Sequence, residues 1–357
     1  MKFTKILATI AASSLISLSP VEGGESIVPT FTDDMKVCGG PWSSGRPDGH
    51  APIGVMADHT HHAGEWMFSY RYMFMHMDGN RMGDRSISDS EVFGAGFAVA
   101  PQEMDMHMNM FGAMYAPTDW LTIAVMTSYN TKEMTLRRNP HMHMHGHGGH
   151  SGTFGHSSEG WGDTTLSALV PLFNAGGQSA HIGLGIGFPT ADVEEKQDGV
   201  FLPYGMQLGR GLWDLRPSIT YLGQCSWFSW GAQATGIIGL EDENSAGFAQ
   251  GDVFNTTGWV AAMLNDWASI SARLNYTHQS SWSGHYNGPH LHAAPPHFIE
   301  NFGGDFLEGG IGLNLLSPLG LKGHRVGIEA LFPIHQDVNG IQMDRDFSIV
   351  VGWQYSF

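Results

Sequence analysis

The last eleven residues of this 357-residue chain alternate in character along an extended strand. One face carries large apolar side chains: Phe347, Ile349, Val351, Trp353, Tyr355 and Phe357. The other face carries Ser348, Gly352, Gln354 and Ser356, and Val350 departs from the pattern. Side chains alternate with a period of two along a strand, and a transmembrane β-barrel needs an apolar outer face and a smaller or polar inner face. This segment therefore predicts a barrel strand.

The same alternation recurs from Trp66 onward in about 12 strand-like segments, separated in turn by short and long connections. The long connections fall near residues 78–102, 138–162, 190–211, 241–252, 280–303 and 335–344. Only 14% of the residues are charged, against about 25% in soluble domains. We therefore expect residues 64–357 to form an all-β, antiparallel, up-and-down transmembrane barrel with short periplasmic turns and long extracellular loops.

The N-terminus is typical of an exported protein. Lys2 and Lys5 precede an apolar run over residues 6–18, which ends before Pro20. This run is too short for a membrane helix, so residues 1–23 are expected to be a cleaved signal peptide. Residues 24–63 are rich in Gly, Pro and Asp and lack periodicity. They are expected to form an irregular periplasmic segment or a small plug in the lumen.

These features together predict the outer membrane of a Gram-negative cell. The terminal aromatic carboxylate resembles the signal that outer-membrane barrels present to the barrel assembly machinery. Outer-membrane lipid and lipopolysaccharide are then the expected surroundings. The formal net charge of −17 argues against nucleic-acid binding. The sequence contains neither a Gly-x-Ser-x-Gly nor a His-Glu-x-x-His motif, so we expect no enzymatic activity and no catalytic residue.

The two cysteines, Cys38 and Cys225, permit one disulfide in an oxidising compartment. Both are expected near the periplasmic end of the barrel, where a bridge would attach the N-terminal segment to the rim. The alternative is two unrelated thiols.

Several residues are expected to face the lumen: Arg71, Met73, Met75, Asp214, Arg216, Arg273, Glu308, Arg325 and Glu329. Charges of both signs inside a barrel usually pair with each other and fill the interior, so we favour that role over substrate selection. Residues 103–110 alternate polar and Met side chains. If the polar set points inward, Met104, Met106, Met108 and Met110 face lipid.

Histidine and methionine, 20 of each, form the main chemical signal. One predicted extracellular loop holds His141, Met142, His143, Met144, His145, His147, His150 and His156. Imidazole binds Cu(II), Zn(II) or Ni(II), and thioether sulfur suits Cu(I), so this loop predicts metal capture with copper favoured. The alternative is a low-complexity loop without a ligand role. Secondary candidates are His285, His290, His292 and His297, and His59, His61 and His62.

Several runs of sequence resemble a known family. They include residues 51–56 followed by Asp58-His59, and residues 64–73, 114–117, 184–190 and 202–209. Together they resemble the outer-membrane "transporter" barrels grouped with the phenol meta-pathway MetA-like proteins, over about residues 51–357. The resemblance implies a barrel that carries small molecules, and it brings no catalytic residue.

Two functions follow as expectations. The first is passive passage or binding of small solutes, with Cu, Zn or Ni ions captured by the His/Met-rich loops and no required cofactor. The alternative is a channel for hydrophobic or aromatic small molecules with incidental metal affinity, or a structural barrel without a pore.

Overall fold

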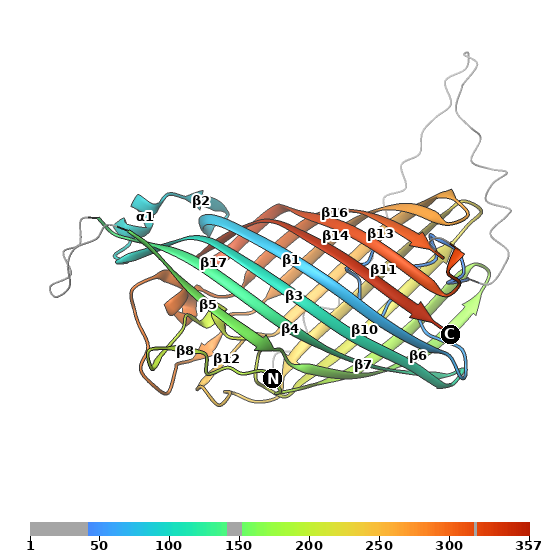
Figure 1. The fold of residues 1–357 in the computed structure, drawn as a ribbon, viewed down its shortest axis with the longest axis horizontal. Helices are drawn as coiled ribbons and strands as arrows, with labels where there is room; N and C mark the ends of the chain where they lie inside the picture. The colour runs from blue at the N-terminus through green and yellow to red at the C-terminus, as the bar shows by residue number, and fades with distance from the viewer. Residues whose placement is uncertain (1–41, 141–151, 318–319) are drawn as a thin grey trace, which may run out of the picture.

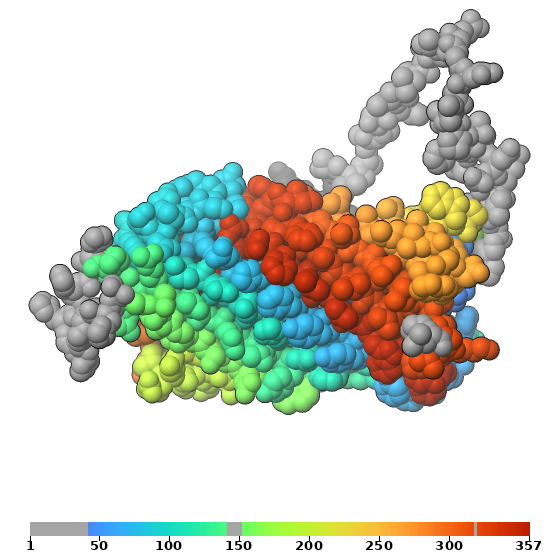
Figure 2. Space-filling model, turned by 45° about the horizontal axis from the view of Figure 1, so that its top comes forward, coloured from blue at the N-terminus to red at the C-terminus, as the bar shows by residue number. Residues whose placement is uncertain are grey.

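The computed structural model describes residues 42–140, 152–317 and 320–357 (Figure 1). One antiparallel sheet curls into a closed barrel because its first and last strands pair, from Met67 opposite Ser356 to Gly83 opposite Val338. In Figure 2 the red surface of the last strand lies beside the blue surface of the first, where the barrel closes. Closure gives each strand of the ring a paired neighbour on both sides. The predicted all-β antiparallel barrel is confirmed.

The wall is made of eleven strands in sequence order. They are β1 (Trp66–Gly83), β3 (Val99–Thr118), β4 (Leu121–Arg138), β6 (Thr164–Ala175), β7 (Gln178–Phe188), β10 (Asp214–Gln224), β11 (Phe228–Gly239), β13 (Val253–Asn265), β14 (Ala268–Gln279), β16 (Gly304–Leu316) and β17 (His324–Ser356). The 33-residue β17 has two arms, since residues 325–338 pair with β16 and residues 341–356 pair with β1. The prediction of about 12 strands therefore fits.

Shorter elements lie outside this ring. β2 (Arg85–Ile87) pairs with the end of β1, and β5 (Thr153–Trp161) extends the pairing of β4. The remaining elements are α1 (Asp89–Gly94), β8 (Lys196–Gln197), β9 (Val200–Phe201), β12 (Phe248–Ala249) and β15 (Ser283–Gly284), with 3-10 turns η2 (Tyr204–Met206), η3 (Pro295–His297) and η4 (Ile299–Asn301). Within the described residues, no helix combines the length and apolar character needed to cross a bilayer.

The two ends of the barrel differ in their connections. At the end that carries the C-terminus, called the short-turn end, adjacent strands are joined by two or three residues at 119–120, 176–177, 225–227 and 266–267. Gly176 and Gly177 both have positive φ, as a type I′ hairpin turn requires. At the opposite, long-loop end, the connections include residues 84–98, 189–213, 240–252 and 280–303. Figure 1 shows α1, β2, β8 and β12 gathered there.

The outer face of the wall is apolar. Exposed aromatic side chains ring the short-turn end: Trp66, Trp120, Trp227, Trp267 and Phe357. A second set lies toward the long-loop end: Trp161, Trp213, Phe254 and Phe332. Exposed aliphatic side chains such as Leu184, Val260 and Ile311 lie between them. An apolar band between two aromatic girdles is the outer surface that a lipid-embedded barrel requires.

Residues 42–63, called the luminal segment, lie inside the barrel toward the short-turn end. Inward-facing wall side chains bind their backbone. The wall donors to backbone carbonyls of the segment are Arg71 to Ile53, Ser229 to Asp48, Ser269 to Pro47 and Gln233 to Met56. In the opposite direction, Arg46 of the segment donates to the carbonyl of Cys225 in the wall. Asn174, Gln224 and Thr122 accept from backbone N–H groups of the segment. Because buried backbone polar groups need partners, these side chains allow a segment without regular structure to be buried.

The luminal segment explains why Val350 breaks the terminal alternation. Val350 is 2% exposed and packs against Ile53 and Leu331. Nearby wall positions are glycines because Ile53 occupies their space; a Cβ on Gly352 would lie 2.6 Å from Ile53 Cγ1. In the same strand, Val351, Trp353 and Phe357 are exposed whereas Ser348 and Gln354 are buried.

Candidate functional site

Three neighbouring cavities lie along the inside of the wall. The upper cavity, about 250 Å³, lies under the long loops and is lined by Met77, Met104, Met134, Lys132, Trp282, Phe302, Phe306 and Arg345 among others. The middle cavity, about 290 Å³, shares Met106, Lys132 and Gln250 with it. The lower cavity, about 50 Å³, shares Met126 and Thr165 with the middle one and borders the luminal segment at Met56 and Asp58. The shared residues make the three consecutive.

Methionine side chains form one wall of this path. The register places Met73, Met75 and Met77 of β1 opposite Met108, Met106 and Met104 of β3, and Met104 opposite Met134 of β4. Met108, Met110 and Met126 line the middle cavity. Thioether side chains are flexible and polarizable, so this wall adapts to the shape of an apolar molecule.

This arrangement corrects the lipid-facing orientation considered for Met104, Met106, Met108 and Met110. These side chains face the lumen, and the polar set Glu103, Asp105, His107 and Asn109 faces outward. Outward polar groups pair between strands: Tyr72 Oη lies 2.7 Å from His107 Nδ1, and His76 Nδ1 lies 2.7 Å from Asp105 Oδ1. Such pairs satisfy polar side chains on the outer surface of the long-loop half, which the alternation alone did not indicate.

Aromatic side chains of the long loops cover the upper cavity. The rings of Tyr204 and Tyr286 stack with centroids 4.2 Å apart, and Trp282 stacks on Phe302 at 4.3 Å. Gln207 donates to Tyr286 Oη at 2.9 Å, and Tyr286 Oη donates to the Leu202 carbonyl. Burial raises the pKa of both Tyr204 and Tyr286, so the cover is uncharged at neutral pH. Loops 200–207 and 280–303 thus close the long-loop end with an apolar layer.

Two cations face the upper cavity without an ion-pair partner among the described residues. Lys132 Nζ donates to the carbonyls of Gly205 (2.9 Å) and Gln207 (2.6 Å). The Arg345 guanidinium lies 3.6 Å from the centroid of the Phe306 ring, and Glu308 contributes only a longer-range attraction. Backbone carbonyls orient an ammonium group but do not neutralise its charge. The cavity therefore combines apolar walls with an unbalanced positive charge.

Most other predicted lumen charges are paired inside the wall. Arg273 Nε lies 2.7 Å from Glu329 Oε1, and both side chains are buried. Arg216 Nε lies 2.6 Å from Asp214 Oδ1. Arg325 donates to Gln354, Asn314 and the Ala51 carbonyl, and Asn275 donates to Glu308 at 2.9 Å. Met73 packs beside Ile53 and Val350. Except for Met75, which lies opposite Met106, these residues hold the wall or the luminal segment.

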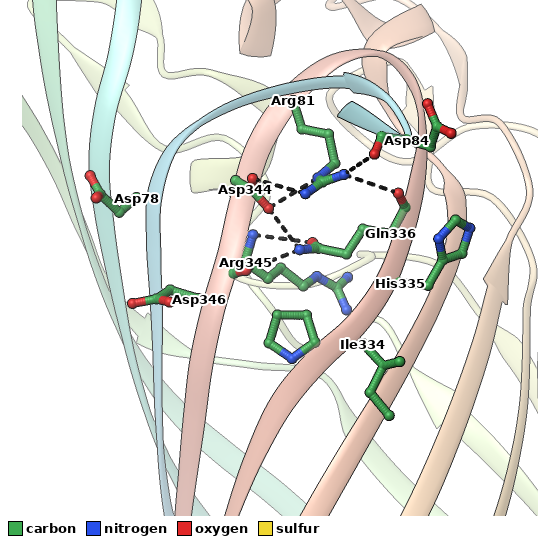
Figure 3. A pocket seen from close by; sticks show the side chains of 10 residues that line it. Asp78, Arg81, Asp84, Ile334, His335, Gln336, Asp344, Arg345 and Asp346 are labelled. Carbon is green, nitrogen blue, oxygen red and sulfur yellow. Dashed lines mark hydrogen bonds and ion pairs between the residues drawn. The ribbon is translucent and has the colours of Figure 1, made fainter. Parts of the chain in front are cut away.

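A separate hollow of about 440 Å³ lies where β17 bends, between its two arms and the end of β1 (Figure 3). Arg81 Nε donates to Asp344 Oδ1 at 3.0 Å, and Gln336 donates to the same carboxylate at 2.7 Å. The Gln336 side chain also bonds the backbone of Arg345 in both directions. These polar groups are already hydrogen-bonded to one another. Their contacts therefore have a structural role, joining the strands at this rim.

The predicted metal ligands fall into three groups. His141, Met142, His143, Met144, His145, His147 and His150 lie outside the described residues. His156, in β5, bonds Gln197 Oε1 at 2.7 Å through Nδ1. Of the second group, His290 and His292 have ring centroids 4.5 Å apart, His285 is exposed and His297 is buried. These four do not form a three-ligand cluster among the described residues.

The third group is divided by the fold. His59 and His61 are buried in the luminal segment, whereas His62 is exposed and lies 3.6 Å from Asp119. The structure adds His50 and Asp58 to the buried pair. Their meeting could not be predicted from the sequence, because a segment without periodicity gives no signal of which residues meet. The adjacent pair Asp58-His59 was the only sign of this buried cluster in the local sequence.

The predicted disulfide lies partly outside the description. Cys225 is buried at the short-turn end, and Arg46 donates to its carbonyl oxygen at 2.7 Å. Cys38 lies outside the described residues, and the bridge stays a prediction.

Comparisons with known proteins show the fold. No family model and no curated protein matches the chain. Among solved structures, an outer-membrane channel from Pseudomonas putida F1 aligns with a TM-score of 0.58 and 12% identity, covering 85% of this chain and 100% of that one. The monoaromatic hydrocarbon channel TodX, as a deltaS2S3 mutant, aligns with a TM-score of 0.43 and 10% identity, covering 83% and 91%. CymD, another monoaromatic hydrocarbon channel, gives 0.41 and 9%, covering 89% and 97%. The first likeness shows that this chain has the fold of an outer-membrane channel.

Proposed function

We propose that this protein is an outer-membrane channel for small, largely apolar molecules about the size of one substituted aromatic ring. The observation that carries the proposal is the methionine-lined series of cavities between the long loops and the luminal segment. The long loops would face the exterior and the short turns the periplasm, after signal-peptide export and insertion by the barrel assembly machinery. The membership in the MetA-like transporter group that the sequence suggests is part of this proposal.

The lumen supports a channel for apolar molecules better than copper capture by outer loops. The upper and middle cavities lie near the lower end of the roughly 300–1,000 Å³ range of ligand sites. Sulfur–aromatic contacts contribute about 0.3–1.5 kcal/mol each without demanding one ligand shape. Because the luminal segment fills the short-turn end, passage requires this segment to move aside.

Lys132 and Arg345 further favour molecules that carry one acidic group. A carboxylate entering the upper cavity would meet both cations, while an aromatic body would contact Met104, Met106 and Phe306. Hydrogen bonds to charged groups contribute about 1.5–3 kcal/mol, which corresponds to about 10–100-fold in affinity.

Benzoate and toluene share an aromatic ring, but only benzoate carries a carboxylate. Comparing their affinities therefore separates the contribution of the two cations from that of the apolar walls. We expect Lys132→Met and Arg345→Met to weaken benzoate binding about 10–100-fold each and to leave toluene binding unchanged or tighter. Equilibrium dialysis of purified, detergent-solubilised protein measures both. Lys322→Met, at an exposed position near the short turns, is the matched control and should behave as wild type. Benzoate affinity unaffected in both cavity variants would contradict the assignment.

Acid should loosen the loop that covers the upper cavity. His297 is 5% exposed, and burial lowers its pKa to about 4, assisted by the nearby His156, His290 and His292. Its Nδ1 can accept a hydrogen bond from the Ala294 N–H when neutral or donate to the Ala294 carbonyl when protonated, and burial outweighs the second bond in lowering the pKa. Since the pKa is lower in the docked loop, docking is fully stable above about pH 6.5 and weakens as the pH falls toward 4.

At pH 5 this linkage removes about 2 kcal/mol from the docking of the loop. We expect faster amide hydrogen exchange over residues 297–301 at pH 5 than at pH 7.5, after correction for intrinsic rates. His297→Asn keeps an acceptor and does not titrate, so its exchange should depend less on pH. Equal pH dependence in the two proteins would show that another group controls the loop.

A further inference from the structure

We infer that the luminal segment binds one transition-metal ion, Cu(II) in preference, through His50, Asp58 and His59, with His61 beside them. This site is distinct from the upper and middle cavities and from the His-rich loop, and it meets the lower cavity only at Asp58. It lies between the lower cavity and the short-turn end.

The ligand geometry is largely assembled. One ligand atom from each of His50, Asp58 and His59 lies within 4.8 Å of the other two. Asp58 Oδ1 lies 2.9 Å from His59 Nδ1, and Asp58 Oδ2 lies 3.7 Å from His50 Nδ1. All three residues are buried. Metal bonds of about 2.0–2.2 Å place neighbouring ligand atoms about 3 Å apart in the tetragonal geometry that Cu(II) prefers. Asp58 and His59 already meet this spacing, and His50 needs to move closer to Asp58 by less than about 1 Å.

Two imidazole nitrogens at this place have no hydrogen-bond partner among the described residues. His50 Nδ1 and His61 Nε2 are buried and accept or donate no hydrogen bond. The rings of His50 and His61 each lie 4.8 Å from the ring of His59 on a centroid-to-centroid basis. Buried polar atoms are seldom left unsatisfied, and a metal ion between these rings would satisfy them.

The surrounding groups hold the ligands in place. The Ala51 N–H donates to Asp58 Oδ2 at 3.0 Å, and Glu65 Oε2 lies 3.4 Å from His61 Nδ1. A carboxylate on the far nitrogen of a histidine fixes its tautomer and orientation in metal sites. The segment is also fixed to the wall on both sides, through the Ala51 carbonyl to Arg325 and through the His61 N–H to Thr122 Oγ1 at 3.0 Å.

The ligand types suit copper, and the positive charges nearby require an ion that forms strong bonds to its ligands. Two or three imidazoles with one carboxylate suit Cu(II), Zn(II) or Ni(II), whereas Ca²⁺ and Mg²⁺ prefer oxygen ligands alone. Arg71 and Arg325 act electrostatically on Asp58, so a dication must offset their repulsion through strong bonds. Cu(II) forms the strongest such bonds in the first-row series. A bound ion would join residue 50 to residues 58–61 and hold the luminal segment closed.

The test needs a background in which the outer loop does not bind copper. In the full chain, His141, His143, His145, His147 and His150 are replaced by Asn. We expect this background to retain one Cu(II) per chain after dialysis, with nitrogen hyperfine structure in its electron paramagnetic resonance spectrum. In that background, His59→Gln and Asp58→Asn should each lower the Cu(II) affinity about 10–100-fold.

His62→Gln is the matched control, since His62 is a neighbouring but exposed imidazole, and it should retain wild-type affinity. His50→Gln provides a second ligand variant if either of the others fails to reach the heat-modifiable, folded form on gels. Loss of all copper from the background protein, or equal affinity in the folded Asp58, His59 and His62 variants, would overturn the site. Benzoate binding is measured in the same proteins and reports the channel proposal separately.

Discussion

Deleting residues 42–62 should open the short-turn end of the barrel. These residues fill the barrel toward the short-turn end, and their backbone is held by side chains from several wall strands. The wall strands pair with one another around the whole ring, so the barrel does not depend on the segment for closure. We expect single-channel conductance in planar bilayers to rise, because the lumen then lacks its filling and only loops 200–207 and 280–303 cover the path.

A shortened loop at the other end provides the control for this deletion. Removing part of residues 84–96 leaves the luminal segment in place, and this variant should keep the low conductance of the wild type. If the 42–62 deletion variant is folded, as judged by heat-modifiable migration on gels, and its conductance is unchanged, the luminal segment does not block the path.

Glu329→Ala should destabilise the barrel by about 3–5 kcal/mol, because it leaves a buried arginine without its partner. Glu329 is 1% exposed; it pairs with Arg273 at 2.7 Å and accepts from the Gly54 N–H at 2.9 Å. Urea unfolding of protein refolded into lipid vesicles, followed by tryptophan fluorescence, measures the change.

Glu308→Ala is the matched control, since Glu308 is a half-buried lumen carboxylate with one amide partner, Asn275. Its loss should cost about 1 kcal/mol. The double variant Arg273→Met with Glu329→Leu should recover most of the stability, because no charge is then left unpaired. Equal destabilisation by Glu329→Ala and Glu308→Ala would show that the buried Arg273–Glu329 pair contributes no more to stability than the half-buried Glu308.

The sequence predicted the barrel wall well because lipid imposes a simple rule on it. Every second side chain of a wall strand meets an apolar solvent, and residues such as Trp353 and Phe357 report that directly. The close alternation of short and long connections fixed the direction of each strand. The exception at Val350 had no explanation in its own strand, because the cause is Ile53 in a distant part of the chain.

The lumen was harder to predict because its contents obey no single rule. In residues 103–110 neither face is clearly lipophilic, and the inward side was decided by the neighbouring strands, where Arg71 already points into the barrel. The luminal segment has no periodicity, so the meeting of His50 with Asp58 and His59 depends on a backbone path that only the wall side chains define. We expected the buried lumen charges to pair with one another. The sequence did not indicate which residues form each pair, such as Arg273 with Glu329.

Uptake by liposomes that contain the full-length protein tests the central claim most directly. Radiolabelled benzoate and glucose are compared in wild-type protein and in Met106→Trp, which would fill the junction between the upper and middle cavities. Our account predicts that benzoate enters faster than glucose and that Met106→Trp abolishes the difference. Equal entry of the two solutes, or benzoate uptake unchanged by Met106→Trp, would contradict a methionine-lined path through the barrel.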